Sequence, residues 1–460
     1  MCLPARWMRP RGRLAAYVAA ALRARAPART SPRRCGDVDP RRAPPYVAAA
    51  HRAAWGSRLM GPLEGIRILD LSQGIAAPYA TKLLSDHGAD VVKVEHPGRG
   101  DVSRRMGPFP DDVPHRDRSG MFLELNTSKR SVTLNLKTAT GAEILGRLAQ
   151  QADLVIESFR PGVVERLGLG PERLEELNPR AALVSVSNFG QYGPYRDFEV
   201  DDMLAYAMGG VLSITAEWGR EPLKIATYAP FFLAGGVVAA FTLGALRGSQ
   251  TSGVGERADI SLHDILATSM DRGGTNLAAY EYSGSLFFQR QESARTTALP
   301  MGVYPAVDGY VHVICAPMWW DRFCNMIGRP DLIEDEHLVP NLLNVDFAPE
   351  IDAVFYPWLL ERSKQEIMEA GQAQGLPVSA INTTADVAND PHLAARGFFE
   401  DVEMPGGGTV ALPGFPFRMH GTPGEIRPAP ALGEHTVEVL TERLGYSKQD
   451  VVVLAQRGVV

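Results

Sequence analysis

Residues 66–97 read IRILDLSQGIAAPYATKLLSDHGADVVKVEHP. The stretch opens with an apolar segment (66–72), continues with a segment of helical spacing (77–89), and closes with a second apolar segment (90–97). A strand, a helix and a strand of these lengths form one right-handed unit of a parallel sheet. Since no GxGxxG follows the first strand, the stretch lacks the usual dinucleotide-binding fingerprint.

The same alternation continues along the chain. Further strands are predicted at 131–137, 153–159 and 181–190, and a strand that runs into a helix at 256–273. The apolar run from Phe231 to Leu246 predicts a buried helix, because it is shorter than the roughly 20 residues that a membrane span needs. The pattern predicts an α/β fold with a Rossmann-like, mostly parallel sheet and no membrane partner.

A different pattern begins near residue 300. Residues 301–316 form two apolar segments around Asp308 and Gly309, which is a strong hairpin signal. Segments with helical spacing follow at 319–328 and 356–375. This part of the chain therefore predicts a second, smaller α+β domain.

Composition excludes several classes of protein. Of the 460 residues, 45% are hydrophobic and 22% are charged, which is typical of a globular protein. The net charge of −6 gives no indication of a nucleic-acid partner. The four cysteines form no CxxC pair, which argues against a metal site or a disulfide framework and favours a reducing, cytoplasmic location.

Residues 1–59 differ from the rest of the chain. They are rich in Ala, Arg and Pro, show no sustained hydrophobic period, and are predicted to be disordered. Three explanations stay open: an artefact of the start site, with Met60 as the true start, a targeting segment, or a functional basic arm.

Candidate ligand contacts follow the predicted strands. In an open α/β sheet, ligands bind beyond the carboxyl ends of the strands and against helix N-termini. The segments at these positions carry several basic side chains, which together suit a phosphate-bearing ligand. These side chains are Lys129, Arg130, Lys137, Arg160 and Arg166.

The motifs in combination resemble one family. They include residues 63–101, LNTSKRSVTLNLKT (125–138), ADLVIESFRPGVVERLG (152–168), MGVYPAVDGYVHV (301–313) and PALGEHTVEVL (430–440). In this order they resemble the class III CoA-transferases, which include formyl-CoA transferase and carnitine CoA-transferase and share their fold with α-methylacyl-CoA racemase. The resemblance runs from about Leu63 to the C-terminus.

The resemblance implies an organisation and a chemistry. It implies an interlocked dimer in which each large domain contains both ends of the chain. We therefore divide the chain into the extension (1–59), the first part of a large CoA-binding domain (60–285), a linker with the small domain (286–390), and a return to the large domain (391–460). It also implies acyl-CoA and a carboxylic acid as substrates, with no permanently bound cofactor.

The family's CoA contacts can be carried over by position. They fall on Ile75, Ala76, His96, Leu134, Asn135, Leu136, Lys137, Ser158, Phe159, Arg160 and Arg166. Arg166 keeps the chemical role best, whereas His96 stands where some relatives carry Arg. Glu199 stands where one relative uses Lys, so the charge is reversed at that contact.

The family's catalytic aspartate has no counterpart. Transferases of the family use an Asp carboxylate that attacks the thioester, in a pattern like PLKxxxxxADxxAG. Residues 222–236 read PLKIATYAPFFLAGG, which places Phe231 at the Asp position. In the racemases a His and a Glu complete the site, and Asp201 and Asp264 stand in their places. Asp201 and its neighbour Asp202 are weak catalytic candidates, because either could instead cap the helix that follows.

Three interpretations stay open. The chain is an active CoA-transferase whose carboxylate comes from elsewhere, or the subunit without a nucleophile in a heteromer with a paralogous CoA-transferase, or an acyl-CoA-binding or isomerase-like relative without transferase activity. We favour the second slightly over the first. The sequence identifies neither the acyl group nor the choice between homodimer and heteromer.

Overall fold

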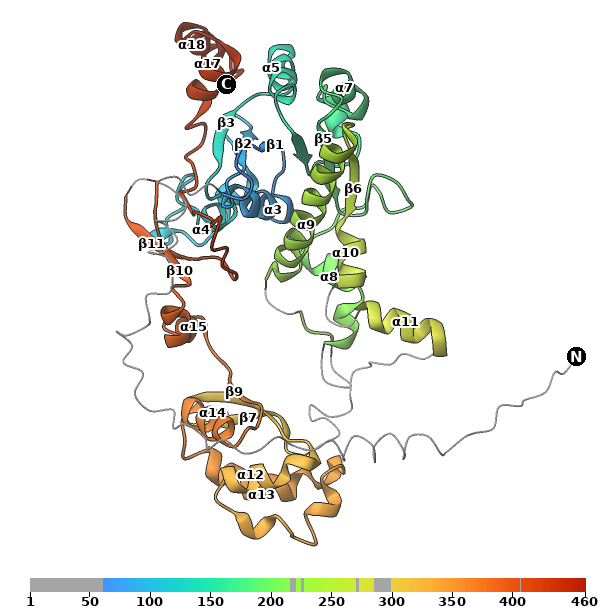
Figure 1. The fold of residues 1–460 in the computed structure, drawn as a ribbon, viewed down its shortest axis with the longest axis vertical. Helices are drawn as coiled ribbons and strands as arrows, with labels where there is room; N and C mark the ends of the chain where they lie inside the picture. The colour runs from blue at the N-terminus through green and yellow to red at the C-terminus, as the bar shows by residue number, and fades with distance from the viewer. Residues whose placement is uncertain (1–60, 216–220, 225–226, 270–272, 285–298, 406) are drawn as a thin grey trace, which may run out of the picture. The chain divides into compact units, whose positions relative to one another are not determined.

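The computed structural model describes residues 61–215, 221–224, 227–269, 273–284, 299–405 and 407–460. The predicted extension (1–59) and residues 286–298 of the predicted linker lie outside these ranges. The described residues contain one large parallel sheet, one small antiparallel sheet and one isolated hairpin, with helices between the strands (Figure 1).

The large sheet has six parallel strands in the order β3-β2-β1-β4-β5-β6. The chain begins at the centre of this sheet and moves to one edge, then returns to β4 and moves to the other edge. A doubly wound sheet of this kind has its ligand crevice where the strand order reverses, beside β1 and β4. The strands are β1 (Arg67–Asp70), β2 (Asp90–Glu95), β3 (Arg130–Thr133), β4 (Leu154–Glu157), β5 (Ala182–Ser187) and β6 (Arg257–Ser261).

Helices cover both faces of this sheet (Figure 1). Alternate strand residues such as Val155 and Leu183 pack against one set of helices, and their neighbours Leu154 and Val184 pack against the other. The predicted α/β fold is therefore confirmed. The first set is α5 (Ala139–Ala149), α7 (Pro171–Leu177), α17 (Thr436–Leu444) and α18 (Lys448–Gln456); the second is α3 (Ala76–Ser85), α9 (Ala229–Ser252) and α10 (Leu262–Ser269).

The predicted apolar helix is α9, and it packs closely on α3. Gly235 allows the close approach, because a Cβ at this position would lie 2.6 Å from the carbonyl oxygen of Ala76. Ala234 and Val238 on the same helix are fully buried. Among the described residues, α9 is the one helix long and apolar enough to cross a membrane. The predicted buried helix is buried on one side only, because Leu233 and Phe241 are exposed.

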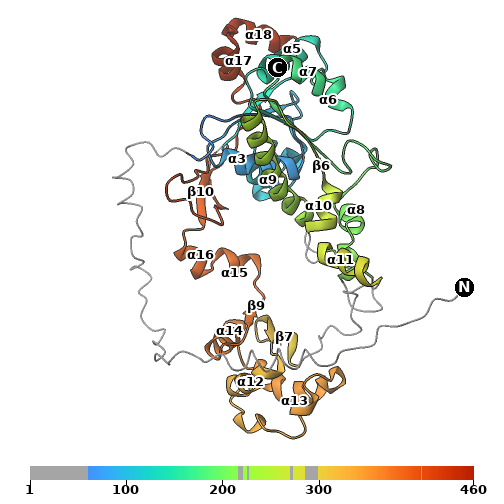
Figure 2. The same cartoon turned by 45° about the vertical axis from the view of Figure 1, so that its right-hand side comes forward.

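The C-terminal segment packs against the large sheet (Figure 2). The backbone N–H of Asn135 donates to the carbonyl of Val459 at 2.7 Å, and that of His435 donates to Ser131 at 2.9 Å. The side chains of α17 and α18 join the same hydrophobic core as β3 and β4. Both ends of the described chain therefore contribute to one sheet domain.

The small sheet has the antiparallel order β7-β8-β9, and the predicted turn at Asp308 and Gly309 joins its first two strands. Its core includes the helices that follow. The single helix predicted over 356–375 is wrong, because residues 360–363 separate two helices and Ser363 caps the second with Glu366. The elements are β7 (Met301–Ala306), β8 (Gly309–Ile314), β9 (Val378–Ala380), α12 (Trp320–Met326), α13 (Ala348–Leu359) and α14 (Lys364–Ala373).

Shorter elements complete the described chain. β10 and β11 form the hairpin, which packs on α4 through Phe122 and Val402. These elements are α4 (Gly120–Leu125), α6 (Val163–Arg166), α8 (Asp202–Met208), α11 (Gly273–Ser283), α15 (Thr384–Ala388), α16 (Pro391–Ala395), β10 (Phe399–Glu403) and β11 (Thr409–Pro413).

Candidate functional site

A cavity of about 270 Å³ lies at the carboxyl ends of β1, β4 and β5, where the strand order reverses. We call it the sheet-edge cavity. It brings together five of the residues expected to contact CoA and Phe231, although these lie on three separate segments of the sequence. The lining residues are Gln73, Gly74, Ile75, Ala76, Ala77, Ser158, Phe159, Arg160, Pro161, Val186, Ser187, Asn188, Arg196, Asp197, Phe198, Phe231 and Leu262.

The loop after β1 forms one wall of the sheet-edge cavity. The backbone N–H of Gln73 donates to Ser158 Oγ at 2.8 Å, and that of Gly74 donates to Asp101 Oδ1 at 3.3 Å. Gly74 has a φ of 81°, a conformation that side chains disfavour. Ile75 precedes the first turn of α3 and has no polar side chain to cap it, so the amides of Ala76 and Ala77 are left for water or an anion.

Basic side chains surround the turn after β4. Arg160 lines the cavity and forms an ion pair with Glu199 at 2.6 Å, in which both side chains are largely exposed. A Cβ placed on Gly162 would lie 3.3 Å from Arg166 Nη1 and 3.6 Å from Arg196 Nη2. The guanidinium groups of Arg160, Arg166 and Arg196 thus lie near the turn that contains Gly162. An anion bound there would compete with Glu199 for Arg160.

Arg196 and Phe198 are lining residues that the sequence analysis missed. They lie on the loop after β5, where Phe189, Tyr195 and Phe198 pack ring against ring with centroids 4.9 to 6.2 Å apart. A signal was present in the sequence, because the segment FGQYGPYRDF (189–198) combines aromatic and basic residues directly after a predicted strand.

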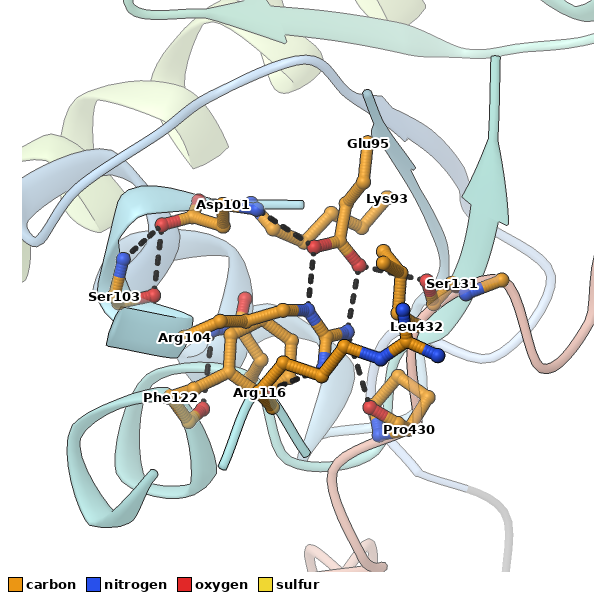
Figure 3. Close-up of polar contacts among 12 residues, drawn as sticks. Lys93, Glu95, Asp101, Ser103, Arg104, Arg116, Phe122, Ser131, Pro430 and Leu432 are labelled. Carbon is orange, nitrogen blue, oxygen red and sulfur yellow. Dashed lines mark hydrogen bonds and ion pairs between the residues drawn. The ribbon is translucent and has the colours of Figure 1, made fainter. Parts of the chain in front are cut away.

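A buried ionic network supports this edge of the sheet (Figure 3). Arg104 binds the Glu95 carboxylate through two nitrogens at 2.7 Å and contacts the carbonyl of Pro430 at 3.2 Å. Lys93 pairs with Asp101 at 2.9 Å, and Asp101 in turn accepts the bond from Gly74. The network therefore fixes the loop after β1 and ties it to the C-terminal segment.

Asp70 at the end of β1 belongs to a second buried cluster. Burial raises the pKa of its carboxyl, but Lys93 and Lys129 together with hydrogen bonds from Ser72 and Thr81 outweigh burial and lower the pKa to about 2. Lys129 Nζ lies 3.2 Å from Asp70 Oδ2. The carboxylate is consequently ionised and committed to holding the strand end.

Lys129 and Arg130, two of the predicted ligand contacts, do not line the sheet-edge cavity, because both are paired with acids elsewhere. The Lys129 side chain is fully buried. Arg130 pairs with Asp90 and Glu438.

The other expected CoA contacts do not line the sheet-edge cavity. The side chain of Leu134 is buried in the core, so a contact there would involve its backbone. Asn135 bonds the C-terminal segment through the carbonyl of Gly458, and Leu136 packs against the core. His96 and Lys137 are exposed, as is Arg166.

Phe231 lies in the first turn of α9. Tyr228 precedes this helix with a φ of 60°, and Pro230 occupies the first turn. The nitrogen of Tyr228 donates to Asp202 Oδ2 at 3.0 Å, and Lys224 bonds the same oxygen. Asp202 is thus buried and holds the start of α9 in place.

Asp201 caps α8, since its Oδ1 accepts from the backbone N–H of Leu204 at 2.8 Å. Of the described residues that line the sheet-edge cavity, Asp197 is the only carboxylic acid, and it lies 3.8 Å from Arg196. The arrangement suits binding of an anionic ligand. In the first turn of α9, the phenyl ring of Phe231 stands where a nucleophile would be needed. Asp264, which is exposed, lies in the first turn of α10.

Glu157, at the end of β4, is a further titratable group beneath the cavity. Burial raises the pKa of its carboxyl to about 7, although a hydrogen bond from the Phe159 backbone at 2.7 Å opposes the shift. It is 2% exposed and does not line the cavity.

Fold and cavity together define a class: a doubly wound α/β protein with a ligand site at the switch point of its parallel sheet. The model of CoA-transferase family III matches residues 63–436. The chain belongs to this family, as the motifs indicated.

Relatives with known names agree with this assignment. The chain is 32% identical to succinyl-CoA–D-citramalate CoA-transferase of Chloroflexus aurantiacus over 87% of this chain and 98% of the relative. It is also 32% identical to the beta subunit of succinyl-CoA–L-malate CoA-transferase of that organism, over 87% of this chain and 98% of the subunit. A CAIB/BAIF family protein from Brucella suis, 29% identical, matches in structure over 84% of this chain and 100% of its own with a TM-score of 0.71.

Proposed function

We propose that this chain binds a CoA thioester in the sheet-edge cavity and acts as a subunit of a CoA-transferase, which transfers CoA between an acyl-CoA and a carboxylic acid. One observation carries the proposal. The chain folds so that Ile75, Ala76, Ser158, Phe159 and Arg160 meet around a single cavity with Phe231 on its wall.

The charges around the cavity support binding of the nucleotide part of CoA. Arg160, Arg166 and Arg196 can pair with phosphate oxygens through planar, multi-donor groups. The exposed rings of Tyr195 and Phe198 offer apolar faces beside these charges. His96, Asn135 and Lys137 contribute contacts further along the same edge of the sheet in this proposal.

The missing carboxylate favours a heteromer. Phe231 cannot attack a thioester, so the catalytic carboxylate comes from a paralogous subunit. Among the relatives, succinyl-CoA–L-malate CoA-transferase has subunits named alpha and beta. A homodimer is the alternative assembly. In either form we propose a cytoplasmic protein that uses CoA thioesters as substrates and holds no permanent cofactor.

Calorimetric titration of the purified full chain with CoA tests the binding site. We expect Arg160→Ala to weaken binding about tenfold, since an ionic contact to phosphate is lost. Glu199→Ala should instead strengthen binding, because it frees Arg160. Arg173→Ala is the matched control, since Arg173 is an exposed arginine paired with Glu176 outside the cavity. If CoA does not bind the wild-type chain, the proposal fails.

Phe231 also supports a second candidate function, binding of acyl-CoA without transfer. Two activity assays distinguish the two candidate functions. One uses this chain alone, and the other uses this chain mixed with a relative that carries the aspartate. Hydroxylamine or borohydride trapping, followed by mass spectrometry, then identifies the residue that forms the acyl intermediate. Binding of CoA with no transfer in any mixture would favour the second candidate.

A further inference from the structure

A second cavity, of about 470 Å³, lies on the other side of the α9 N-terminus. We call it the hairpin cavity, because β11 contributes Val410 and Leu412 to its lining and the loop between β10 and β11 contributes Met404 and Pro405. Its volume is that of an ordinary small-molecule site.

The two cavities flank a single helical turn. Phe231 lines the sheet-edge cavity, and the next residue, Phe232, lines the hairpin cavity. Consecutive Cα atoms are about 3.8 Å apart, so the two linings meet at neighbouring residues of α9. A thioester bound beside Phe231 would therefore have its acyl group within reach of the hairpin cavity.

The walls of the hairpin cavity are held by buried contacts. The guanidinium carbon of Arg104 lies 3.5 Å from the centre of the Phe122 ring, and Arg104 itself belongs to the ionic network in Figure 3. Ser119 caps α4 and donates to the carbonyl of Ser103 at 2.7 Å. Phe232 packs edge to face against Tyr79 with ring centres 5.1 Å apart. The cavity is consequently formed before any ligand enters.

The lining is predominantly apolar. Phe109, Met121, Phe122, Phe232 and Leu412 provide aromatic and aliphatic surface. Two of the three ionisable members carry little free charge, because Asp117 is paired with Arg104 and burial raises the pKa of the Glu124 carboxyl. The third, Arg118, has a buried Nε without a hydrogen-bond partner among the described residues.

We propose that the hairpin cavity receives the acyl group of the CoA thioester and selects a bulky apolar acyl group, aliphatic or aromatic. This inference rests on the proposed function. It assigns to this chain a substrate class different from the succinyl, malate and citramalate named for its relatives. Methylene groups buried against the apolar lining supply affinity.

Calorimetric titration of the full chain with CoA, acetyl-, butyryl-, hexanoyl-, benzoyl- and succinyl-CoA tests the inference. We expect affinity to rise about fourfold per added methylene, from the usual transfer free energy of a buried methylene. Butyryl-CoA and succinyl-CoA have acyl chains of equal length, so their comparison isolates the carboxylate. Butyryl-CoA should bind more tightly, because the lining is predominantly apolar; tighter binding of succinyl-CoA would instead indicate that Arg118 pairs with the second carboxylate.

Two variants assign the effect to the hairpin cavity. Val410→Asp should abolish the preference for hexanoyl-CoA over CoA and leave CoA affinity unchanged. Met404→Glu, in the loop after β10, should also abolish the preference for hexanoyl-CoA. Because this residue lies outside the strands, the variant tests the cavity even if Val410→Asp fails to fold. Val437→Asp, on the exposed side of α17, is the matched control and should leave both affinities as in the wild type.

The outcomes separate the two proposals. If CoA binds but affinity does not change with acyl length, or succinyl-CoA binds more tightly than butyryl-CoA, this inference is wrong and the proposed function stands. If no CoA species binds, the proposed function fails first. Sedimentation velocity adds a third outcome: if Val410→Asp dissociates an oligomer and no acyl preference exists, a second copy of the chain fills the cavity and the inference is overturned.

Discussion

The carboxylate of Asp202 accepts a hydrogen bond of 3.0 Å from the backbone nitrogen of Tyr228. Tyr228 has a positive φ and directly precedes α9, so Asp202 on one helix fixes where the next helix begins. Three residues further on, Phe231 forms part of the sheet-edge cavity. An acid that the sequence offered as a weak catalytic candidate therefore has a positioning role in the structure.

Asp202→Ala should lower the free energy of unfolding by about 1–3 kcal/mol, because it leaves the Tyr228 N–H and Lys224 without their acceptor. We also expect weaker CoA binding, since the first turn of α9 loses its anchor. Urea denaturation and calorimetric titration measure the two effects.

Asp201→Ala is the matched control for that experiment. Removal of an N-cap should cost about 1 kcal/mol and leave CoA binding unchanged. If Asp201→Ala kept normal stability but abolished transferase activity in a mixture that is active with the wild-type chain, this assignment would be contradicted and Asp201 would be a catalytic base.

The contact between α3 and α9 provides a second test. Gly235→Ala should destabilise the fold by about 1–3 kcal/mol, because the new Cβ would meet the Ala76 carbonyl at 2.6 Å. Ala76 also lines the sheet-edge cavity, so CoA affinity should fall with stability. Thermal denaturation and titration of the same preparation give both values.

Gly236→Ala, one residue further along α9, is the control. No heavy atom lies within 4 Å of the Cβ it would add. Alanine favours a helix over glycine, so this variant should gain up to about 1 kcal/mol in stability. If both variants behave alike, the close crossing at Gly235 does not exist.

Much of the fold could be predicted from the sequence, because its signals are local. Alternating apolar segments predicted the strands of the large sheet, and the Asp308–Gly309 turn predicted the small-domain hairpin. The helix predicted over 356–375 failed because its apolar spacing continues across the Ser363 cap, so the break is visible only from the capping residues.

The candidate site was less predictable, because it depends on contacts between distant segments. Family motifs placed Ile75 and Arg160 at the cavity, but no local pattern pairs Arg104 with Glu95 or brings Pro430 beside it. Basic residues around β3 looked equivalent in sequence. The structure distinguishes them, because the Lys129 side chain is buried and paired with Asp70, whereas Lys137 is exposed.

The pH dependence of stability should depend on Glu157. Its pKa is raised by burial from 4.5 to about 7, so the folded state holds a proton that the unfolded state has released between these values. The protonated Glu157 carboxyl therefore contributes its full share to the free energy of unfolding below pH 4.5. This contribution, about 3 kcal/mol in total, is lost as the pH rises to 7. The glutamine in Glu157→Gln cannot ionise, so the free energy of unfolding of this variant should not show this loss.

The measurement compares wild type and Glu157→Gln in urea denaturation at pH 5 and pH 8. We expect the variant to gain about 2–3 kcal/mol relative to the wild type over this interval. Glu143→Gln, which changes an exposed glutamate on α5, should show no such gain. An equal pH profile for wild type and Glu157→Gln would show that Glu157 is ionised in the folded protein.

Phe231→Asp tests whether the rest of the catalytic site is intact. The variant places a carboxylate in the first turn of α9, where the helix dipole stabilises negative charge and where no acid stands now. If the sheet-edge cavity binds a thioester in the family's manner, the new carboxylate should attack it and displace CoA thiolate. We expect a mixed anhydride that hydroxylamine traps at residue 231 and that mass spectrometry detects.

Two variants make this experiment decisive. Phe231→Asn has the same size as the aspartate without its nucleophilic oxygen and should give no trapped product. Phe232→Asp places the charge in the hairpin cavity, on the other side of the helical turn, and should also give none. If all three variants bind CoA and none forms the adduct, the position beside Phe231 is not where the thioester lies. The thioester would then have to be sought along His96, Asn135 and Lys137 at the same edge of the sheet.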